Sequence, residues 1–367
     1  MKKIFLQLSL FFAGTALFAQ APTNYYSTAT GTEFTLKTQL YNIIKGHTTK
    51  SYDALKGLYR QTDSDNGFQD KYYEKDNTIL DIYSEIAEGK DPYNYTPGQK
   101  ECGTYSNEGD CYNREHLIPQ SVFSEVKPMV SDAFHIWPTD GKVNGMRSNY
   151  PHGMVGNTTY TSKNGSKLGS ALNSGFSSGY SGTVFEPIDE FKGDVARAYF
   201  YFATRYQENG IQGWKYAMFN NTKDQVFTDT FLKILMTWHL NDPVSQREID
   251  INNLVYRYQK NRNPFIDHPE YVGKIWGEDL GSTDFEYQKR DDISVYNKSS
   301  KAVVVRLENN AKAIQRVTVF TFNGQMVNQI MNTSNKKEIE VNFTAPGIYI
   351  IKVEGDKMEI NKRVVIK

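Results

Sequence analysis

The segment NREHLIPQS (residues 113–121) precedes SDAFHIWPTDGKVNGMRSN (residues 131–149), and together they hold the densest polar chemistry of the chain. Apolar residues such as Phe134 and Trp137 are interleaved with the polar ones. A solvated loop has no need of such anchors, so the pattern predicts a folded polar site. A polar hairpin with hydrogen-bonded histidines is the competing interpretation. The polar residues are Arg114, Glu115, His116, His135, Asp140, Lys142, Asn144, Arg147 and Asn149.

Glu115 and His116 are neighbours, and on an extended segment neighbouring side chains point to opposite faces. A carboxylate can then hold a cation on one side while the imidazole meets a water or substrate on the other. The glycine-containing stretch at residues 138–149 suits a turn into a helix that brings Asn144 back as a neutral oxygen ligand. One carboxylate and one carboxamide, completed by waters, suit a hard cation such as Mg²⁺.

The same residues raise the question of two other hydrolytic chemistries. A zinc site would use His116 and His135 with Glu115, but their spacing fits no HExxH helix and only His152 lies nearby as a further ligand. A serine hydrolase lacks the GxSxG elbow. The zinc hydrolase remains the rival enzyme.

The rest of the chain up to residue 276 predicts mainly helices, because apolar residues recur there at helical spacing. Two helices are expected between Glu33 and Tyr59, with Gly46 near their junction. A helix with apolar residues on nearly every face is expected at residues 194–206. Further helices are expected at residues 227–240 and 249–259.

Few strands are expected before residue 277. TILDIY at residues 78–83 alternates and predicts one strand. Residues 153–183 are rich in Gly, Ser, Thr and Asn, and predict a long surface loop. From Ile293 onward, short alternating runs separated by turns predict a small antiparallel β-sandwich.

The chain has 367 residues, with 42 basic and 42 acidic side chains and 39% hydrophobic residues, which is ample for a packed core. Residues 1–19 have the charged start, apolar run and small final residue of a secretory signal peptide. No other stretch approaches a membrane-spanning length, so no integral membrane segment is expected. In an exported protein the two cysteines, Cys102 and Cys111, are expected to form a disulfide.

Charge is unevenly distributed. Residues 20–285 carry more acidic than basic side chains, whereas residues 286–367 carry an excess of basic ones. An acidic domain does not bind polyanions strongly by bulk electrostatics. Any nucleic-acid chemistry must therefore depend on local positive charge.

The segments quoted above resemble the endonuclease I family of secreted or periplasmic, nonspecific bacterial DNA and RNA endonucleases with a ββα-metal (His-Me finger) site. The resemblance extends to KGDVARAYFYFATRY at residues 192–206 and NRNPFIDHPEYV at residues 261–272. It implies that Glu115 and Asn144 bind the metal and that His116 is the general base. It also implies Mg²⁺ as cofactor, with Mn²⁺ or Ca²⁺ as alternatives, and 5′-phosphate products from DNA and from RNA.

Other roles follow from the resemblance less directly. His135, Arg147 and Asn149 are candidates to orient the base or hold phosphate, and a structural role is the alternative for each. The family's insert with a phosphate-binding arginine has no match here, which leaves Arg114, Lys127, Lys142 and Arg147 as candidates for that task. Arg197, in an apolar helix, is expected either in a buried salt bridge or in contact with phosphate.

The C-terminal run GIYIIKVEGDKMEINKRVVIK resembles the sorting domain of the type IX secretion system, which implies export to the medium or the cell surface by that machinery. A carbohydrate- or surface-binding module is the alternative interpretation of this C-terminal run.

For the whole chain we expect an α+β fold, and we expect the protein to be a monomer. The expected parts are a signal peptide at residues 1–19, a mainly helical endonuclease domain at 20–280, a linker at 281–292, and a β-sandwich sorting domain at 293–367.

Overall fold

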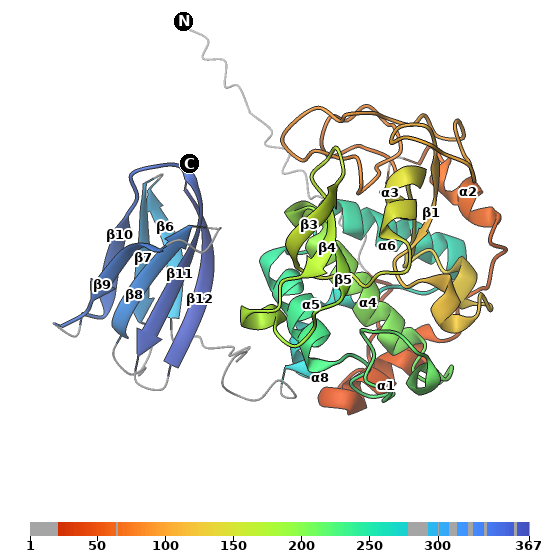
Figure 1. The fold of residues 1–367 in the computed structure, drawn as a ribbon. Coiled ribbons are helices and arrows are strands. Elements are labelled where there is room, and N and C mark those ends of the chain that lie inside the picture. Colours follow the sequence, from red (N-terminus) through yellow and green to blue (C-terminus); the bar gives the residue numbers. More distant parts are fainter. Residues whose placement is uncertain are drawn as a thin grey trace, which may run out of the picture. The chain divides into compact units, whose positions relative to one another are not determined.

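The computed structural model describes residues 21–63, 65–277, 293–299, 301–307, 314–321, 326–333, 336–355 and 358–366. The expected signal peptide and the expected linker lie outside the described residues. The chain divides after residue 286 into two compact units (Figure 1). Each unit is described by itself.

The larger unit is organised around helix α4 (Lys192–Arg205), all of whose residues are buried. The apolar residues on nearly every face of this segment predicted such burial, and the prediction is confirmed. Helix α4 packs against α1, α5 and α7. The other helices are α1 (Glu33–Ile44), α2 (Ala54–Tyr59), α3 (Gly141–Arg147), α5 (Asp229–Asn241), α6 (Gln246–Gln259), α7 (Pro264–Asp267) and α8 (Glu270–Trp276).

A buried ion-pair network joins α4 to α6. Arg197 donates to both carboxylate oxygens of Glu248, at 2.5 and 2.7 Å, and its side chain is fully buried. Glu248 also completes a capping box with Ser245 at the start of α6. Asp194 of α4 pairs with Arg247 at 2.5 Å. The salt-bridge alternative for Arg197 is therefore the one that the structure contains.

Strands β1 (Tyr112–His116) and β2 (Ile136–Asp140) form an antiparallel pair, in which Glu115 lies opposite Trp137 and His116 opposite Ile136. Helix α3 begins at the residue after β2. The Asp140 carboxylate accepts a hydrogen bond from the Val143 amide at 2.7 Å and so caps α3. Two antiparallel strands followed directly by a helix therefore carry the polar segments.

Two expectations for this unit are wrong. Residues 78–83 form no strand, apart from an isolated bridge between Ile79 and Gln69. Residues 153–183 are not a loop, because a three-stranded antiparallel sheet lies there, in the order β3–β4–β5. Its strands are β3 (Val155–Thr161), β4 (Lys167–Ala171) and β5 (Thr183–Glu186).

The described helices and strands are thus more evenly mixed than the expected, mainly helical domain. Short 3₁₀ helices connect them at η1 (Gln120–Phe123), η2 (Met129–Ser131), η3 (Gly175–Ser177), η4 (Asp189–Phe191) and η5 (Ile211–Gly213). The expected disulfide between Cys102 and Cys111 is present, with Cα atoms 5.6 Å apart.

The smaller unit consists of two antiparallel sheets, with strand orders β10–β7–β6 and β12–β11–β8–β9. Valine and isoleucine side chains from both sheets form one apolar core. This agrees with the expected β-sandwich. The strands are β6 (Ile293–Ser299), β7 (Ala302–Leu307), β8 (Ile314–Thr321), β9 (Met326–Met331), β10 (Glu338–Asn342), β11 (Gly347–Gly355) and β12 (Met358–Ile366).

Within the part of the chain that the structure describes, no helix combines the length and apolar character that a membrane span requires.

The ion pair between α4 and α6 yields a stability prediction. We expect Arg197→Met to lower the free energy of unfolding by about 3–5 kcal/mol, because Glu248 would remain buried without its partner. Arg257→Met is the matched control on α6, since Arg257 pairs with Asp65 at a half-exposed position and such pairs contribute about 0–1 kcal/mol. Urea unfolding of the full chain measures both. Equal losses for the two variants would contradict the assignment.

Candidate active site

Strand β1 separates the candidate residues onto two faces by its alternation. Asn113 and Glu115 share one face, and Arg114 and His116 share the other. The contacts agree with this division. The Asn113 side chain meets Asn144 of α3, whereas the Arg114 and His116 side chains both lie against the ring of Tyr52.

Glu115 is 1% exposed and lies in a polar setting built by distant parts of the chain. Its Oε1 accepts a hydrogen bond from the Tyr83 hydroxyl at 2.8 Å and pairs with Nη1 of Arg147 at 3.0 Å. Burial raises the pKa of Glu115, and the charge of Arg147 and the Tyr83 hydroxyl oppose that rise. One carboxylate oxygen is thus fixed in place.

Arg147 holds the end of β1 as well as its carboxylate. Its guanidinium is buried and donates to the backbone oxygens of His116 at 2.7 Å and Leu117 at 2.5 Å. Because Arg147 is the last residue of α3, these bonds tie the helix to the strand. They leave the guanidinium inside the fold, where it orients Glu115 and His116.

Asn144 and Glu115 fit the donor set of a hard cation. The Asn144 amide nitrogen donates to Oδ1 of Asn113 at 2.7 Å, so the carbonyl oxygen Oδ1 of Asn144 is the atom left for other ligands. Asn113 shares the face of β1 with Glu115, which places Asn144 beside that face. A carboxylate oxygen and an amide oxygen, completed by water molecules, match the ligands that Mg²⁺ takes. These two residues would hold such an ion.

His116 lies on the other face of β1 and is 7% exposed. Its Nε2 is buried without a hydrogen-bond partner, and the ring also bonds to the backbone of Val130. That bond therefore comes from Nδ1, and it leaves Nε2 with a free lone pair. Burial, with smaller contributions from the charges of His135 and Arg114, lowers the pKa of His116 to about 3, although the hydrogen bond to the Val130 backbone opposes this change. The ring is neutral at ordinary pH and can accept a proton.

Arg114 is a cationic residue on the same face of β1 as His116. Its guanidinium carbon lies 3.6 Å from the centre of the Tyr52 ring, and Nη1 donates to the Tyr52 backbone oxygen at 2.9 Å. The Tyr52 ring is also 5.5 Å from the His116 ring, measured between centres. Tyr52 therefore holds the guanidinium close to the candidate base while the Arg114 side chain stays 19% exposed.

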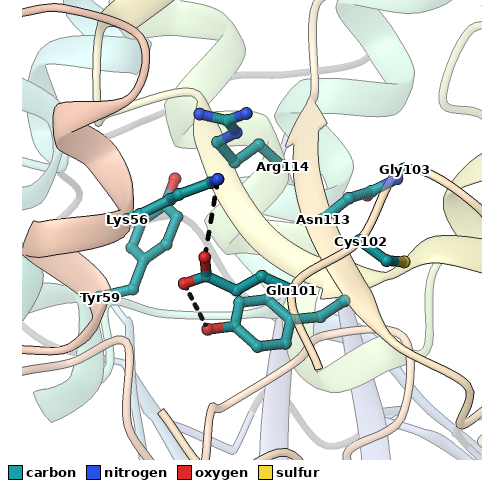
Figure 2. A pocket seen from close by; sticks show the side chains of 8 residues that line it. Lys56, Tyr59, Glu101, Cys102, Gly103, Asn113 and Arg114 are labelled. Carbon is teal, nitrogen blue, oxygen red and sulfur yellow. Dashed lines mark hydrogen bonds and ion pairs between the residues drawn. The ribbon is translucent and has the colours of Figure 1, made fainter. Parts of the chain in front are cut away.

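A pocket of about 320 Å³ lies beside β1 at Asn113 and Arg114 (Figure 2). Lys56 projects into it and pairs with Glu101 at 3.7 Å. Glu101 also accepts a hydrogen bond from the Tyr112 hydroxyl at 3.1 Å. The pocket thus presents two basic groups and one acidic group next to the strand that carries the candidate residues. Its lining is completed by Tyr59, Cys102 and Gly103.

Of the remaining candidates only His135 lies near these contacts, with its ring 6.1 Å from the His116 ring between centres. His135 is fully buried, and its Nε2 bonds to the Met129 backbone oxygen at 2.9 Å. Asn149 is exposed just after α3, and Lys127 is exposed in the connection between the strands. Lys142 is half-buried on α3.

The histidines of the zinc alternative do not gather into a ligand set. Both ring nitrogens of His152 face hydroxyl groups, of Tyr199 at 3.0 Å and of Tyr83 at 3.4 Å. Among the described residues, one cluster of three His, Cys, Asp or Glu side chains could hold a metal ion, and its members, Asp70, Glu74 and Glu85, include no histidine. The structure therefore gives the zinc site no support.

Sequence reasoning missed three residues that shape the site. Tyr83 was placed in an expected strand, although it is the hydroxyl donor to Glu115. Tyr52 lies in the segment for which two helices are expected, and its helical spacing does not reveal that its ring contacts both Arg114 and His116. Asn113 was quoted without a role. Their partners are 31 to 64 positions away in the chain, so no local pattern indicated them.

Comparison with known proteins decides the family. The family model described as Endonuclease I matches residues 32–270, which is most of the chain. The chain belongs to the endonuclease I family. It is 33% identical over 269 residues to a Bacillus subtilis (strain 168) protein named extracellular ribonuclease, covering 72% of this chain and 82% of that one. The Bacillus amyloliquefaciens protein of the same name is 32% identical over 279 residues, at 72% and 85% coverage.

A more distant relative is the protein named Endonuclease-1 of Buchnera aphidicola subsp. Baizongia pistaciae (strain Bp), 24% identical over 136 residues and covering 37% of this chain and 46% of that one. A second family model, the secretion system C-terminal sorting domain, matches residues 288–367. Together these findings make the chain a nuclease, hence a phosphodiester hydrolase, that is secreted or displayed at the cell surface.

The surroundings of the two buried histidines yield a titration prediction. In the metal-free endonuclease we expect the rings of His116 and His135 to stay neutral at about pH 5, because burial lowers their pKa values to about 3 and about 4. The unfolded chain, with histidine pKa values near 6.5, would bind the protons that the folded chain excludes. These rings therefore reduce stability as the pH falls below about 6.5.

The measurement is a ¹H–¹³C NMR titration of the histidine rings from about pH 7 to pH 4. A His116→Gln variant assigns the resonance. Titration of that resonance near pH 6.5 would show that the ring is solvated, contrary to the packing seen here.

Proposed function

We propose that this chain is an extracellular, sequence-nonspecific endonuclease that hydrolyses DNA and also RNA with one divalent cation and a histidine general base. The observation that carries the proposal is the unpartnered, neutral Nε2 of His116, on the residue next to the buried carboxylate of Glu115. The β1–β2–α3 arrangement is the ββα-metal (His-Me finger) site in this proposal. Mg²⁺ is the proposed ion, held by Glu115 and Asn144.

His116 performs the proton transfer in the proposed reaction. Nε2 accepts a proton from a water molecule as the water oxygen attacks phosphorus. The bond from phosphorus to the 3′ oxygen breaks, so the phosphate stays on the 5′ end of the downstream fragment. Water rather than a ribose hydroxyl is the nucleophile, and the same chemistry therefore serves DNA and RNA.

Other side chains orient Glu115 and His116 or stabilise the negative charge that develops on the phosphate. Tyr83 and Arg147 fix one oxygen of Glu115, and Arg147 also fixes the backbone of His116. A divalent cation, when bound, polarises the scissile phosphate and stabilises the leaving oxygen. Arg114 supplies the positive charge that the missing family insert would have provided, because it is the partly exposed guanidinium beside His116.

Export completes the proposal. The C-terminal β-sandwich is recognised by the type IX secretion machinery, in keeping with its match to a secretion sorting domain. The nuclease then acts as a monomer in the medium or at the cell surface. Nucleic acids outside the cell are its substrates.

The first test is cleavage of plasmid DNA and of RNA by the full chain after removal of metal with EDTA. Added Mg²⁺ should restore cleavage, and Zn²⁺ should not. His116→Ala should lose about 10²- to 10⁴-fold in rate, the contribution of a well-placed general base. Circular dichroism must show that the variant is folded. Undiminished cleavage by folded His116→Ala would remove the base from the mechanism, and no cleavage by wild type with either metal would reject the function.

A second test asks which cation contacts the phosphate. Arg114→Ala should lower kcat by about 10²- to 10³-fold, the loss usually caused by removing one donor to developing negative charge. Lys142→Ala and Lys127→Ala should leave kcat within a few-fold of wild type. The Tm of Arg114→Ala separates lost charge from lost packing against Tyr52. A larger loss in either lysine variant would move the phosphate contact away from Arg114.

A further inference from the structure

A group of carboxylates outside the candidate active site lies in the connection between α2 and β1. Asp70, Glu74 and Glu85 each offer a carboxylate oxygen, and these oxygens all lie within 4.8 Å of one another. Asp91 is a fourth acidic neighbour that acts on Glu85 through its charge. Carboxylates repel each other at such distances unless a positive charge joins them. None of the catalytic steps proposed above uses this group.

Glu85 is the member that points to a ligand. Glu85 is 0% exposed, and neither Oε1 nor Oε2 accepts a hydrogen bond from an N–H or O–H group of the protein. Its one side-chain hydrogen-bond neighbour is the carboxyl group of Glu74, which can share a proton with it but supplies no positive charge. The Oε2 atom of Glu74 is also buried without a partner. No Lys, Arg or His among the described residues forms an ion pair with these carboxylates. Buried carboxylate oxygens are costly unless a donor or a cation satisfies them.

The backbone of this connection holds the other carboxylate oxygens in position. Both oxygens of Asp70 accept backbone amides, Oδ1 from Tyr72 and Tyr73 and Oδ2 from Lys75, at 2.7 to 3.0 Å. The Oε1 atom of Glu74 accepts the amide of Asp91 at 2.8 Å. The carboxylates of Asp70 and Glu74 are therefore held by backbone amides of their own loop without any ligand.

We propose that Asp70, Glu74 and Glu85 bind a Ca²⁺ ion that is separate from the ion held by Glu115 and Asn144. Ca²⁺ takes six to eight oxygen ligands at roughly 2.3–2.6 Å, so opposite ligands lie roughly 4.6–5.2 Å apart, which the spacing within 4.8 Å accommodates. Mg²⁺ demands a tighter octahedron and keeps most of its waters, and it suits a cage of several carboxylates poorly. Exposure to the medium gives an exported protein access to Ca²⁺.

The ion would order the segment that positions Glu115. Residues 81–85 contain Asp81, whose Oδ2 accepts the amide of Asp140 at 2.8 Å at the start of α3. They also contain Tyr83, the hydroxyl donor to Glu115. Glu85 lies two residues beyond Tyr83, and its backbone oxygen accepts a hydrogen bond from Asn164. Ca²⁺ thus acts on the site through position and does not touch the substrate.

A proton is the alternative way to neutralise the group. Without a cation, burial and the neighbouring carboxylates raise the pKa of Glu85 to about 9, so that a protonated Glu85 at neutral pH would leave no demand for metal. The two cases differ in their response to added Ca²⁺. The test therefore measures metal binding directly.

The experiment uses the full chain, stripped with EDTA, and thermal unfolding with CaCl₂ alone. At a Ca²⁺ concentration about 100 times the dissociation constant, we expect Tm to rise by roughly 5–10 °C in wild type. Glu85→Gln should abolish the rise, because it removes one ligand charge at nearly constant shape. Glu88→Gln, an exposed position three residues away, should retain it. Glu115→Gln should also retain it, because the proposed site consists of Asp70, Glu74 and Glu85 and does not include Glu115.

Three results would overturn the proposal: no rise in wild type, an equal rise in Glu85→Gln, or a rise abolished only by Glu115→Gln. If Glu85→Gln does not fold, Glu74→Gln, at a partly exposed position, replaces it with the same expectations. The Mg²⁺-dependent cleavage assay is read independently. A nuclease that cleaves but shows no Ca²⁺ shift rejects this site and keeps the function, whereas a Ca²⁺ shift without cleavage does the reverse.

Discussion

The buried guanidinium of Arg147 is the interaction on which the arrangement of the candidate active site depends. It contacts the carboxylate of Glu115 and the backbone oxygens of His116 and Leu117, and so it fixes a side chain and the strand that carries it. A one-residue slip of β1 would exchange the faces of Glu115 and His116. The hydrogen bonds from Arg147 to two successive backbone carbonyl groups oppose that slip, because they fix the position of the backbone itself and not only of the side chains. A lysine could not replace Arg147, because its single ammonium group lacks the planar arrangement of several N–H donors that the guanidinium provides.

Tyrosine hydroxyl groups extend the same constraint through the core. Helix α4 is buried on all sides, yet its tyrosines carry polar ends into places where backbone or carboxylate oxygens need donors. Tyr199 donates to the Leu117 backbone oxygen. Tyr201 and Tyr206, the residue that follows α4, both donate to Asp132, which lies in the connection between β1 and β2. Each ring supplies apolar area while its hydroxyl satisfies a buried acceptor. The central helix therefore locates the β1–β2 connection as well as filling the core.

The sequence predicted those parts whose pattern is local. Helices α4, α5 and α6 and the C-terminal strands follow from periodicity, and the Glu115–His116 alternation follows from strand geometry. The sheet at residues 153–183 was not predicted, because the small polar residues of this segment are typical of loops. Hydrogen bonds between the strands and the buried side chains of Leu168, Val184 and Phe185 stabilise the sheet. The prediction of a strand at residues 78–83 was wrong. The side chains of Asp81 and Tyr83 in this segment hydrogen-bond to Asp140 and Glu115, which lie far along the chain. Tyr83 and Tyr52 act across the fold, which a single sequence does not display.

The acidic balance of the nuclease unit is less of an obstacle to binding a polyanion than the sequence suggests. Many of its carboxylates are buried within hydrogen-bond networks, and Asp132, Asp140 and Glu248 are examples. More carboxylates than cationic side chains are buried in this way, so the surface is less negative than the total count. Field strength at the substrate depends on the nearest exposed charges, because salt screens the others within about 10 Å. Beside His116, Arg114 supplies a partly exposed positive charge that lies 3.8 Å from the exposed carboxylate of Asp53. A divalent cation at Glu115 would add positive charge on the opposite face of the same strand.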